Sequence, residues 1–333
     1  MALDLDALTA GVLAGDRRSL ARAITLVESS REDHRRLAAE LLRRLMPHTG
    51  DSLRIGISGV PGVGKSTFIE ALGLHVLEQG HRLAVLAVDP SSSVSGGSIL
   101  GDKTRMQQLA RRREAFIRPS PAGGTLGGVA RRTRESMLLC EAAGFDVVFV
   151  ETVGVGQSET TVAEMTDLFL LLLLPGGGDE LQGIKRGIME LADLILVNKA
   201  DGELATAARR AAQDYRAALT LLHPRTRGWQ VPVTTCSALT GEGIPEVWSL
   251  IERYRQQVRD SGQFGRRRAD QARSWLWSEI SEGLLEAFRR DRRVRPRLEE
   301  LEQAVTANRL PPAVAAAELL ALFLDAGANA PTP

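Results

Sequence analysis

Short apolar runs alternate with stretches of helical periodicity through the middle of the chain. The runs are Leu53 to Ser58, Leu83 to Val88, Val147 to Val150, Leu168 to Leu174, Leu194 to Val197 and Val231 to Thr235. Strands that alternate with helices predict a mainly parallel sheet covered by helices on both faces, which is an α/β fold. The run at Leu168 is far shorter than the roughly 20 residues of a membrane span, and it is typical of a buried parallel strand.

Both ends of the chain have helical spacing without strand signals. We expect a helical N-terminal extension at 1–50, a sheet domain at 51–258, a helical C-terminal arm at 259–328 and a disordered tail at 329–333. The arm repeats apolar residues at helical spacing, among them Trp275, Trp277, Ile280, Leu284, Leu285 and Phe288. Such an arm has to bury this stripe, either on its own sheet domain or on a second subunit. We favour the second subunit and predict a homodimer.

Composition excludes several classes of partner. The chain has 333 residues, and its 42 Lys and Arg nearly balance its 41 Asp and Glu, so no overall field favours nucleic acid or an anionic membrane. Local basic runs such as Arg266 to Arg268 have acidic or apolar neighbours and predict a solvated helix face.

Cys140 and Cys236 lie far apart, and the five histidines lack ligand spacing, so neither a disulfide framework nor a zinc site is indicated. With no secretory signal at the acidic N-terminus, we expect a cytoplasmic protein.

A glycine-rich loop follows the first strand and precedes a helical stretch. It consists of Gly59, Val60, Pro61, Gly62, Val63, Gly64, Lys65, Ser66 and Thr67. This is the phosphate-binding pattern GxxxxGK[ST], in which backbone N–H groups surround the phosphates of a nucleoside triphosphate. Lys65 is expected to reach the β and γ phosphates, and the Ser66 hydroxyl is expected to bind Mg²⁺. The sequence therefore predicts a P-loop NTPase.

Two later loops indicate that the nucleotide base is guanine. Asn198, Lys199 and Asp201 form an NKxD pattern at the end of a buried strand. The Asp201 carboxylate can accept hydrogen bonds from N1–H and the amine of guanine, whereas adenine has no such donor pair. The end of the next strand carries a second loop with a guanine-contacting pattern, Ser237, Ala238 and Leu239. Together these loops predict GTP and GDP as the bound nucleotides.

Acidic residues at the ends of neighbouring strands are candidates for the metal and switch positions. Glu151 ends a strand where most GTPases have the aspartate of DxxG, and Gly154 follows at the right interval to sense the γ phosphate. Asp89 ends the second strand, although an aspartate before proline can also cap a turn or helix. Asp102 follows a glycine-rich stretch that is typical of a segment ordered by the γ phosphate.

These motifs resemble the methylmalonyl-CoA mutase-associated GTPases, the MeaB or ArgK family, over nearly the whole chain. The resemblance rests on the P-loop, Asp89 to Ser92, Gly101 to Met106, Glu151 to Glu159, Pro175 to Lys185 and Asn198 to Asp201. It implies a homodimeric GTPase that binds a cobalamin-dependent methylmalonyl-CoA mutase or a relative and gates the loading of adenosylcobalamin. It also implies that Ser66, Asp89, Asp102 and Glu151 surround Mg²⁺ and that Lys185 approaches the nucleotide when the partner is bound. The chain has no DxHxxG pattern, so cobalamin is expected on the partner.

Two other functions are compatible with a P-loop chain of this kind. An older view of the family gives an ATPase or kinase of arginine and ornithine uptake, which the guanine pattern and the lack of a membrane segment oppose. Metal insertion into a metalloenzyme is the other alternative, and it requires Cys or His ligands near the nucleotide domain that the sequence does not cluster there.

Overall fold

The computed structural model describes residues 3–88, 106–119, 126–152, 158–176, 186–220, 222 and 224–325. The chain divides into two compact units, Met1–Gln271 and Ala272–Pro333, so the boundary falls inside one long helix, α13 (Gln263–Arg290). Within the described parts of the chain, no helix is both long enough and apolar enough to cross a membrane.

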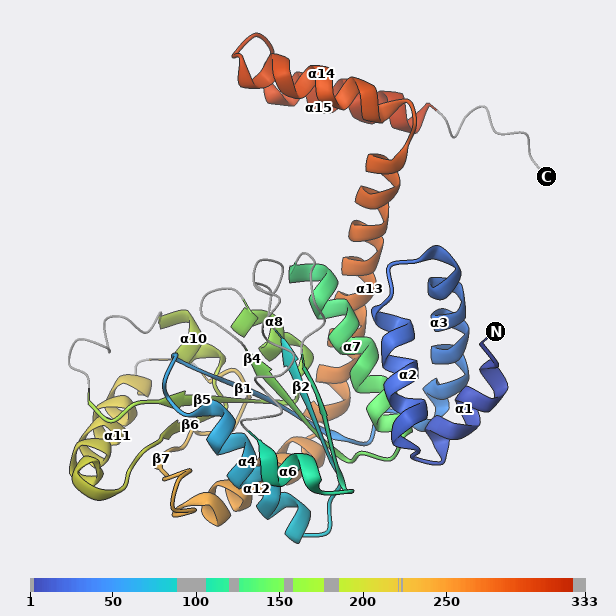
Figure 1. Cartoon of the computed structure of the whole chain (residues 1–333). Helices are drawn as coiled ribbons and strands as arrows, with labels where there is room; N and C mark the ends of the chain where they lie inside the picture. The colour runs from blue at the N-terminus through green and yellow to red at the C-terminus, as the bar shows by residue number, and fades with distance from the viewer. Residues whose placement is uncertain are drawn as a thin grey trace. The chain divides into compact units, whose positions relative to one another are not determined.

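A seven-stranded parallel sheet forms the centre of the first unit (Figure 1). Its order is β3-β2-β4-β1-β5-β6-β7, and all neighbouring strands run parallel. The strands are β1 (Leu53–Gly59), β2 (Leu83–Val88), β3 (Ala115–Arg118), β4 (Val147–Thr152), β5 (Leu168–Leu173), β6 (Leu194–Val197) and β7 (Val233–Thr235). This confirms the predicted parallel sheet. The six predicted runs supply six of the strands, whereas the edge strand β3 was not predicted.

Helices cover both faces of the sheet, as predicted. Figure 1 shows α4 (Lys65–Glu78) and α12 (Ile244–Asp260) on one face and α7 (Leu126–Ala142) and α8 (Ser158–Met165) on the other. The apolar core of the first face joins alternate residues of the strands to Phe68 and Leu72 of α4 and to Trp248 and Ile251 of α12. The other described helices between the P-loop and α13 are α6 (Gln107–Arg111), α10 (Arg186–Leu191), η2 (Gly202–Leu204) and α11 (Ala205–Leu219).

The N-terminal extension is helical and belongs to the same unit. Its elements are α1 (Leu5–Leu13), α2 (Arg17–Glu28), α3 (Glu32–Leu45) and η1 (Met46–His48). Asp4 and Asp16 start the first two helices, because their carboxylates accept hydrogen bonds from the free N–H groups of the first turn. These helices pack on one another and on α7, which buries Leu20, Ile24 and Leu41.

Buried charged residues lie at the amino-terminal edge of the sheet, on the far side from the P-loop. Arg54 of β1 pairs with Glu141 of α7 at 2.7 Å, and both side chains are at most 3% exposed. Arg268 of α13 pairs with Asp167, just before β5, at 2.6 Å. Arg267 donates to the Thr226 hydroxyl at 2.7 Å. The predicted solvated face is therefore wrong for Arg267 and Arg268. Arg268 pairs with the buried Asp167, and Arg267 lies 3.8 Å from the carboxylate of the buried Asp193, just before β6.

The second unit contains the rest of α13 together with α14 (Val294–Thr306) and α15 (Pro312–Leu324). Its small core is formed by Val294, Leu301, Ala315 and Leu319. Phe288 and Phe323 meet edge to face beside this core, with ring centroids 5.5 Å apart. The helical character predicted for the arm is confirmed, and residues 329–333 lie outside the described part of the chain.

Candidate nucleotide site

The predicted phosphate-binding loop joins the carboxyl end of β1 to the start of α4. Two of its glycines occupy positions where an added Cβ would clash with or crowd a neighbouring group. A Cβ on Gly59 would lie 2.5 Å from the carbonyl oxygen of Leu172, and one on Gly64 would lie 3.0 Å from Nδ2 of Asn198. Gly64 also has a φ of 91°, a conformation that glycine adopts without a steric penalty. The loop thus leads directly into the N-terminus of a 14-residue helix, which favours a bound phosphate.

Lys65 points back over this loop. Its Nζ donates a hydrogen bond to the carbonyl oxygen of Gly59 at 2.7 Å, and the side chain is partly buried. Burial lowers the pKa of Lys65, while the carboxylates of Glu151 and Glu159 act in the opposite direction. The ammonium group therefore lies in a desolvated place with acidic neighbours, where an arriving phosphate meets a positive charge.

Glu151 lies near the carboxyl end of β4, in the strand next to β1. The register pairs it with Ile57, two residues before Gly59, and its side chain is only 4% exposed. In the next pair of the two strands, the buried Thr152 hydroxyl donates to Oγ of Ser58 at 2.9 Å. This pairing fixes the end of β4 against the start of the P-loop. The carboxylate of Glu151 and the hydroxyl of Ser66 are oxygen groups of the kind that Mg²⁺ prefers as ligands.

The loops predicted to bind guanine are joined to the P-loop by Asn198. Its Nδ2 donates to the carbonyl oxygen of Val63 at 2.8 Å, and its Oδ1 accepts from the backbone N–H of Ala238 at 3.0 Å. The Sγ of Cys236 lies 3.7 Å from the same oxygen. One buried amide thus connects three loops that lie far apart in the sequence.

Asp201 is held from the second of these loops. The hydroxyl of Ser237, which is fully buried, donates to Oδ1 of Asp201 at 2.6 Å. Lys199 has a positive φ of 60° and an exposed side chain, and the nearby Leu239 is 79% exposed. The structure therefore joins the two predicted base-binding loops through Ser237 and Asp201, whose carboxylate is partly exposed to solvent.

Four predicted site residues lie outside the described part of the chain: Asp89, Asp102, Gly154 and Lys185. Among the described residues, no group of three His, Cys, Asp or Glu side chains is arranged to hold a metal. Glu159 was not among the predicted site residues, yet it is buried near Lys65. In the sequence, Glu159 stands out only as an acidic residue eight positions after Glu151, at the start of a helix.

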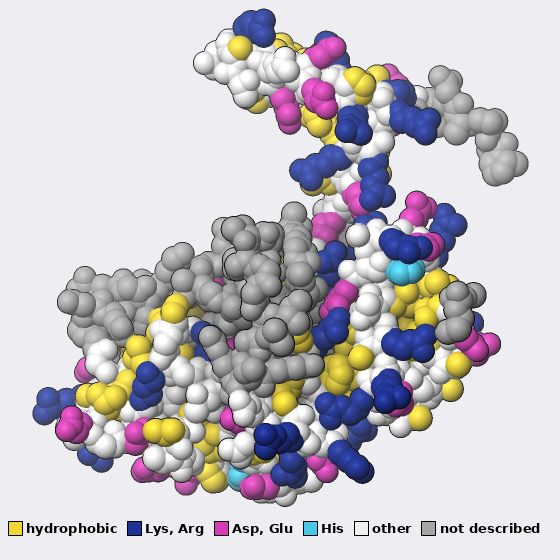
Figure 2. Space-filling view, viewed as in Figure 1, with side chains coloured by type: hydrophobic (Ala, Val, Ile, Leu, Met, Phe, Trp, Pro, Cys, Tyr) yellow, Lys and Arg dark blue, Asp and Glu magenta, His cyan; other side chains and the backbone are white. Residues whose placement is uncertain are grey.

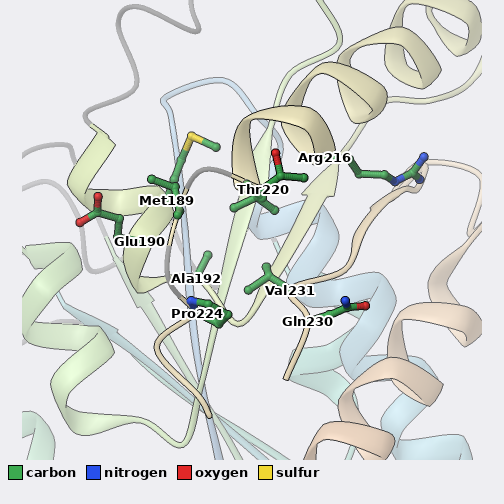
Figure 3. A pocket seen from close by; sticks show the side chains of 10 residues that line it. Met189, Glu190, Ala192, Arg216, Thr220, Pro224, Gln230 and Val231 are labelled. Carbon is green, nitrogen blue, oxygen red and sulfur yellow. The ribbon is translucent and has the colours of Figure 1, made fainter. Parts of the chain in front are cut away.

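Two hollows lie beside the described elements. One of about 360 Å³ opens between α10, α11 and the segment before β7, and none of its lining residues is a predicted nucleotide residue (Figure 3). Arg216 lines it, but its guanidinium group is already bonded to the carbonyl oxygen of Val233. The other hollow, of about 430 Å³, runs along α4 to the guanine loop and is lined by residues that include Thr67, Glu70 and Leu239. The second hollow therefore shares Thr67, Ala238 and Leu239 with the predicted nucleotide residues.

Comparison with known proteins decides the family. A family model for the methylmalonyl Co-A mutase-associated GTPase MeaB matches residues 20–293. The chain belongs to this family. The predicted resemblance to MeaB is thus confirmed, and the predicted nucleotide residues described above belong to a MeaB-family protein.

Several relatives match the chain over nearly its full length. A protein of Caulobacter vibrioides with GTPase in its name is 58% identical over 322 residues, or 97% of this chain and 98% of the relative. The mouse methylmalonic aciduria type A homolog, a mitochondrial protein by name, is 49% identical over 329 residues, covering 96% and 79%. A solved structure titled LAO/AO transport system kinase has a TM-score of 0.78 at 39% identity and covers 97% of this chain and all of that one. MeaB relatives named as GTPases support GTP hydrolysis by this chain.

Proposed function

We propose that this MeaB-family GTPase is a chaperone for a cobalamin-dependent acyl-CoA mutase, with methylmalonyl-CoA mutase as its client. The observation that carries the nucleotide part is the link from Asn198 to the P-loop at Val63 and to the guanine loop at Ala238. This link connects the loop that binds the phosphates to the loop that selects the base. The client part rests on the name of the family and on the mouse relative named for methylmalonic aciduria.

Hydrolysis in this proposal depends on charge placed around the γ phosphate. Lys65 and the N–H groups at the start of α4 stabilise the negative charge of the transferring phosphoryl group. Bound Mg²⁺ would add positive charge there, with Ser66 and Glu151 as its ligands among the described residues. Asp89 and Asp102 complete the proposed ligand set, Gly154 is the proposed sensor of the γ phosphate, and Lys185 is the proposed cation supplied when the mutase is bound.

Cobalamin belongs on the mutase in this proposal, and the GTPase would gate its loading and help to protect or reactivate the mutase. The chain is proposed to act in the cytoplasm, because both cysteines are free and buried as suits a reducing compartment. Burial raises the pKa of Cys236 to about 12, which keeps this thiol protonated and unreactive.

We also propose that the protein is a homodimer formed through the C-terminal unit. In α13 the side chains of Trp277, Ile280 and Leu284 share one face and are 39–63% exposed. Figure 2 shows further hydrophobic side chains between charged ones on α14 and α15, where Leu320 and Leu324 are 51% and 68% exposed. Burying such a stripe in a second copy removes apolar surface from water.

Light scattering tests the dimer. The full chain should have the mass of two copies, and Trp277→Glu combined with Leu284→Glu should give one copy with an unchanged thermal midpoint for the first unit. Leu13→Glu, at an exposed leucine of α1, is the matched control and should stay dimeric. A double variant that keeps the mass of two copies would place the interface elsewhere.

Turnover measurements test the function. With Mg²⁺ present, the purified chain should hydrolyse GTP in preference to ATP, and addition of the mutase should accelerate the reaction. Equal use of both nucleotides would contradict the guanine assignment. A pulldown from cell extract with a non-hydrolysable GTP analogue should capture a cobalamin-dependent mutase. Capture of a transport binding protein or of a metalloenzyme precursor in its place would support the transport or metal-insertion function.

A further inference from the structure

Thr152 is the last residue of β4 and lies between the ends of two other strands. On one side the register pairs it with Val88, the last residue of β2. On the other side its hydroxyl donates to Oγ of Ser58 in β1 at 2.9 Å. Thr152 and Ser58 are 0% and 2% exposed. A buried hydrogen bond between side chains therefore lies at the point where three parallel strands come to an end.

These strand ends lead directly into the predicted phosphate site. Gly59, the first residue of the P-loop, follows Ser58, and Glu151 precedes Thr152. The register of β1 with β4 runs as far as Ile57 and Glu151, one residue before the two hydroxyls. The hydroxyl pair thus continues the connection between the two strands up to the residue next to the P-loop.

The hydroxyl pair and the carboxylate of Glu151 lie on opposite faces of the sheet. Phe149 belongs to the core formed with α4, and Glu151, two residues later in the same strand, projects to that face. Ser58 is two residues after Gly56, where an added Cβ would lie 2.8 Å from side-chain atoms of α8. Ser58 and Thr152 therefore lie on the α8 face, where they can fix the strand ends without occupying the space beside the P-loop helix.

We propose that Thr152 is a positioning residue for GTP hydrolysis, which acts through Ser58 to hold the end of β4 against the P-loop. Binding of GDP is expected to rely on the backbone N–H groups of the P-loop and on the base loops, which do not need this hydroxyl. Hydrolysis in addition requires groups at the strand ends to match the charge that develops on the transferring phosphoryl group, and small displacements of such groups slow a reaction strongly. Loss of the hydroxyl pair should therefore lower turnover more than nucleotide binding. The inference rests on the proposed GTP hydrolysis.

Removal of the hydroxyl with little change of shape tests this role. In Thr152→Val, kcat for GTP should fall about tenfold while the Kd for GDP changes less than about threefold. Thr152→Ser restores a hydroxyl and should recover most of kcat. The matched control is Thr133→Val, because Thr133 is also buried but its hydroxyl donates to the carbonyl oxygen of Val129 within α7; its kcat should stay at the wild-type value. A folded Thr152→Val protein with the wild-type kcat would overturn the inference.

A variant at the other end of the hydrogen bond keeps the test valid if Thr152→Val does not fold. Ser58→Ala removes the acceptor and should likewise lower kcat with little change in the Kd for GDP, and thermal midpoints show whether each protein is folded in the assay. Because both substitutions break the same bond, the double variant should lose no more than about twofold in kcat beyond either single variant. A wild-type kcat in Ser58→Ala, or losses that multiply in the double variant, would show that Thr152 does not act through Ser58.

The failure of this inference differs from the failure of the proposed function. Wild-type protein that hydrolyses no GTP would remove the proposed function itself. Active wild type with an equally active Thr152→Val would remove only the role of Thr152.

Discussion

Replacement of Asp201 by Asn should change which base the site accepts. The carboxylate of Asp201 is the group expected to accept hydrogen bonds from N1–H and the amine of guanine. An asparagine of the same shape keeps one acceptor and turns an N–H₂ group toward a guanine donor. Xanthine, which has a carbonyl oxygen in place of that amine, matches the asparagine instead. The variant should therefore lose affinity for guanine nucleotides and gain affinity for xanthine nucleotides.

The expected loss of affinity follows from the number of hydrogen bonds that the substitution disturbs. A hydrogen bond to a charged group contributes about 1.5–3 kcal/mol, and Asp201→Asn disturbs two of them, so a loss of about 3 kcal/mol is a conservative figure. That corresponds to an affinity for GDP on the order of a hundredfold weaker. Ser237 holds the carboxylate through a 2.6 Å hydrogen bond without being expected to bind the base through its own hydroxyl. Ser237→Ala should therefore cost only about 1 kcal/mol, or roughly a fivefold weaker affinity.

Isothermal titration with GDP and with XDP measures both effects. Asp214→Asn, at an exposed position of α11, removes the same charge from the same unit and should leave both titrations unchanged. An Asp201→Asn protein that is folded and binds GDP within about threefold of wild type would refute the reasoning, because the base would then be chosen by another group.

Two further perturbations test the backbone of the P-loop and the buried charges. Gly64→Ala should weaken GDP binding and lower the thermal midpoint, because alanine at a φ of 91° costs about 1–2 kcal/mol and its Cβ approaches Asn198. The control is Gly265→Ala, at an exposed position of α13, which should be neutral or slightly stabilising. Burial alone would raise the pKa of Glu141, but Arg54 and Arg268 outweigh it and hold that pKa below its ordinary value. The stabilisation from Glu141 is therefore present above its unfolded pKa and is lost as the pH falls below about 4.3. Urea unfolding at pH 7 and at pH 4 measures this effect. At pH 7, Glu141→Gln should be less stable than wild type by about 3 kcal/mol, and its stability should fall less on going to pH 4. An equal pH dependence of the two proteins would assign the acid sensitivity to other groups.

Local patterns were enough to predict the sheet and the position of the loops at its carboxyl edge. Strands such as β1 and β5 are buried on both faces, so they appear in the sequence as continuous apolar runs. The P-loop and the NKxD loop follow such runs directly, which predicts that both lie at the carboxyl ends of the strands, on the same side of the sheet. The parallel strands then bring the P-loop and Asn198 so close that Asn198 limits the space beside Gly64.

Features that depend on distant contacts could not be predicted in this way. The strand β3 has four residues and ends in Arg118, whose guanidinium group pairs with Glu28 of α2. A short edge strand that ends in an arginine lacks the apolar run by which the others were found. The burial of Glu159 and of Arg268 likewise depends on which element packs against them, and neither residue type is expected inside a protein.

Charged residues have different roles at the amino ends and at the carboxyl ends of the strands. At the amino edge, Arg268 and Asp167 satisfy each other at 2.6 Å, so these charges fix geometry and are not available to a ligand. A pair of this kind adds little net stability, but loss of one partner leaves an uncompensated buried charge, so it holds the start of α13 strictly in place. At the carboxyl edge, Lys65 bonds only a neutral carbonyl oxygen at the distance of a hydrogen bond in the described structure, while its acidic neighbours act from further away. An ammonium group that donates to a neutral carbonyl oxygen can donate to a phosphate in its place. The arginines that pair with buried carboxylates cannot do so.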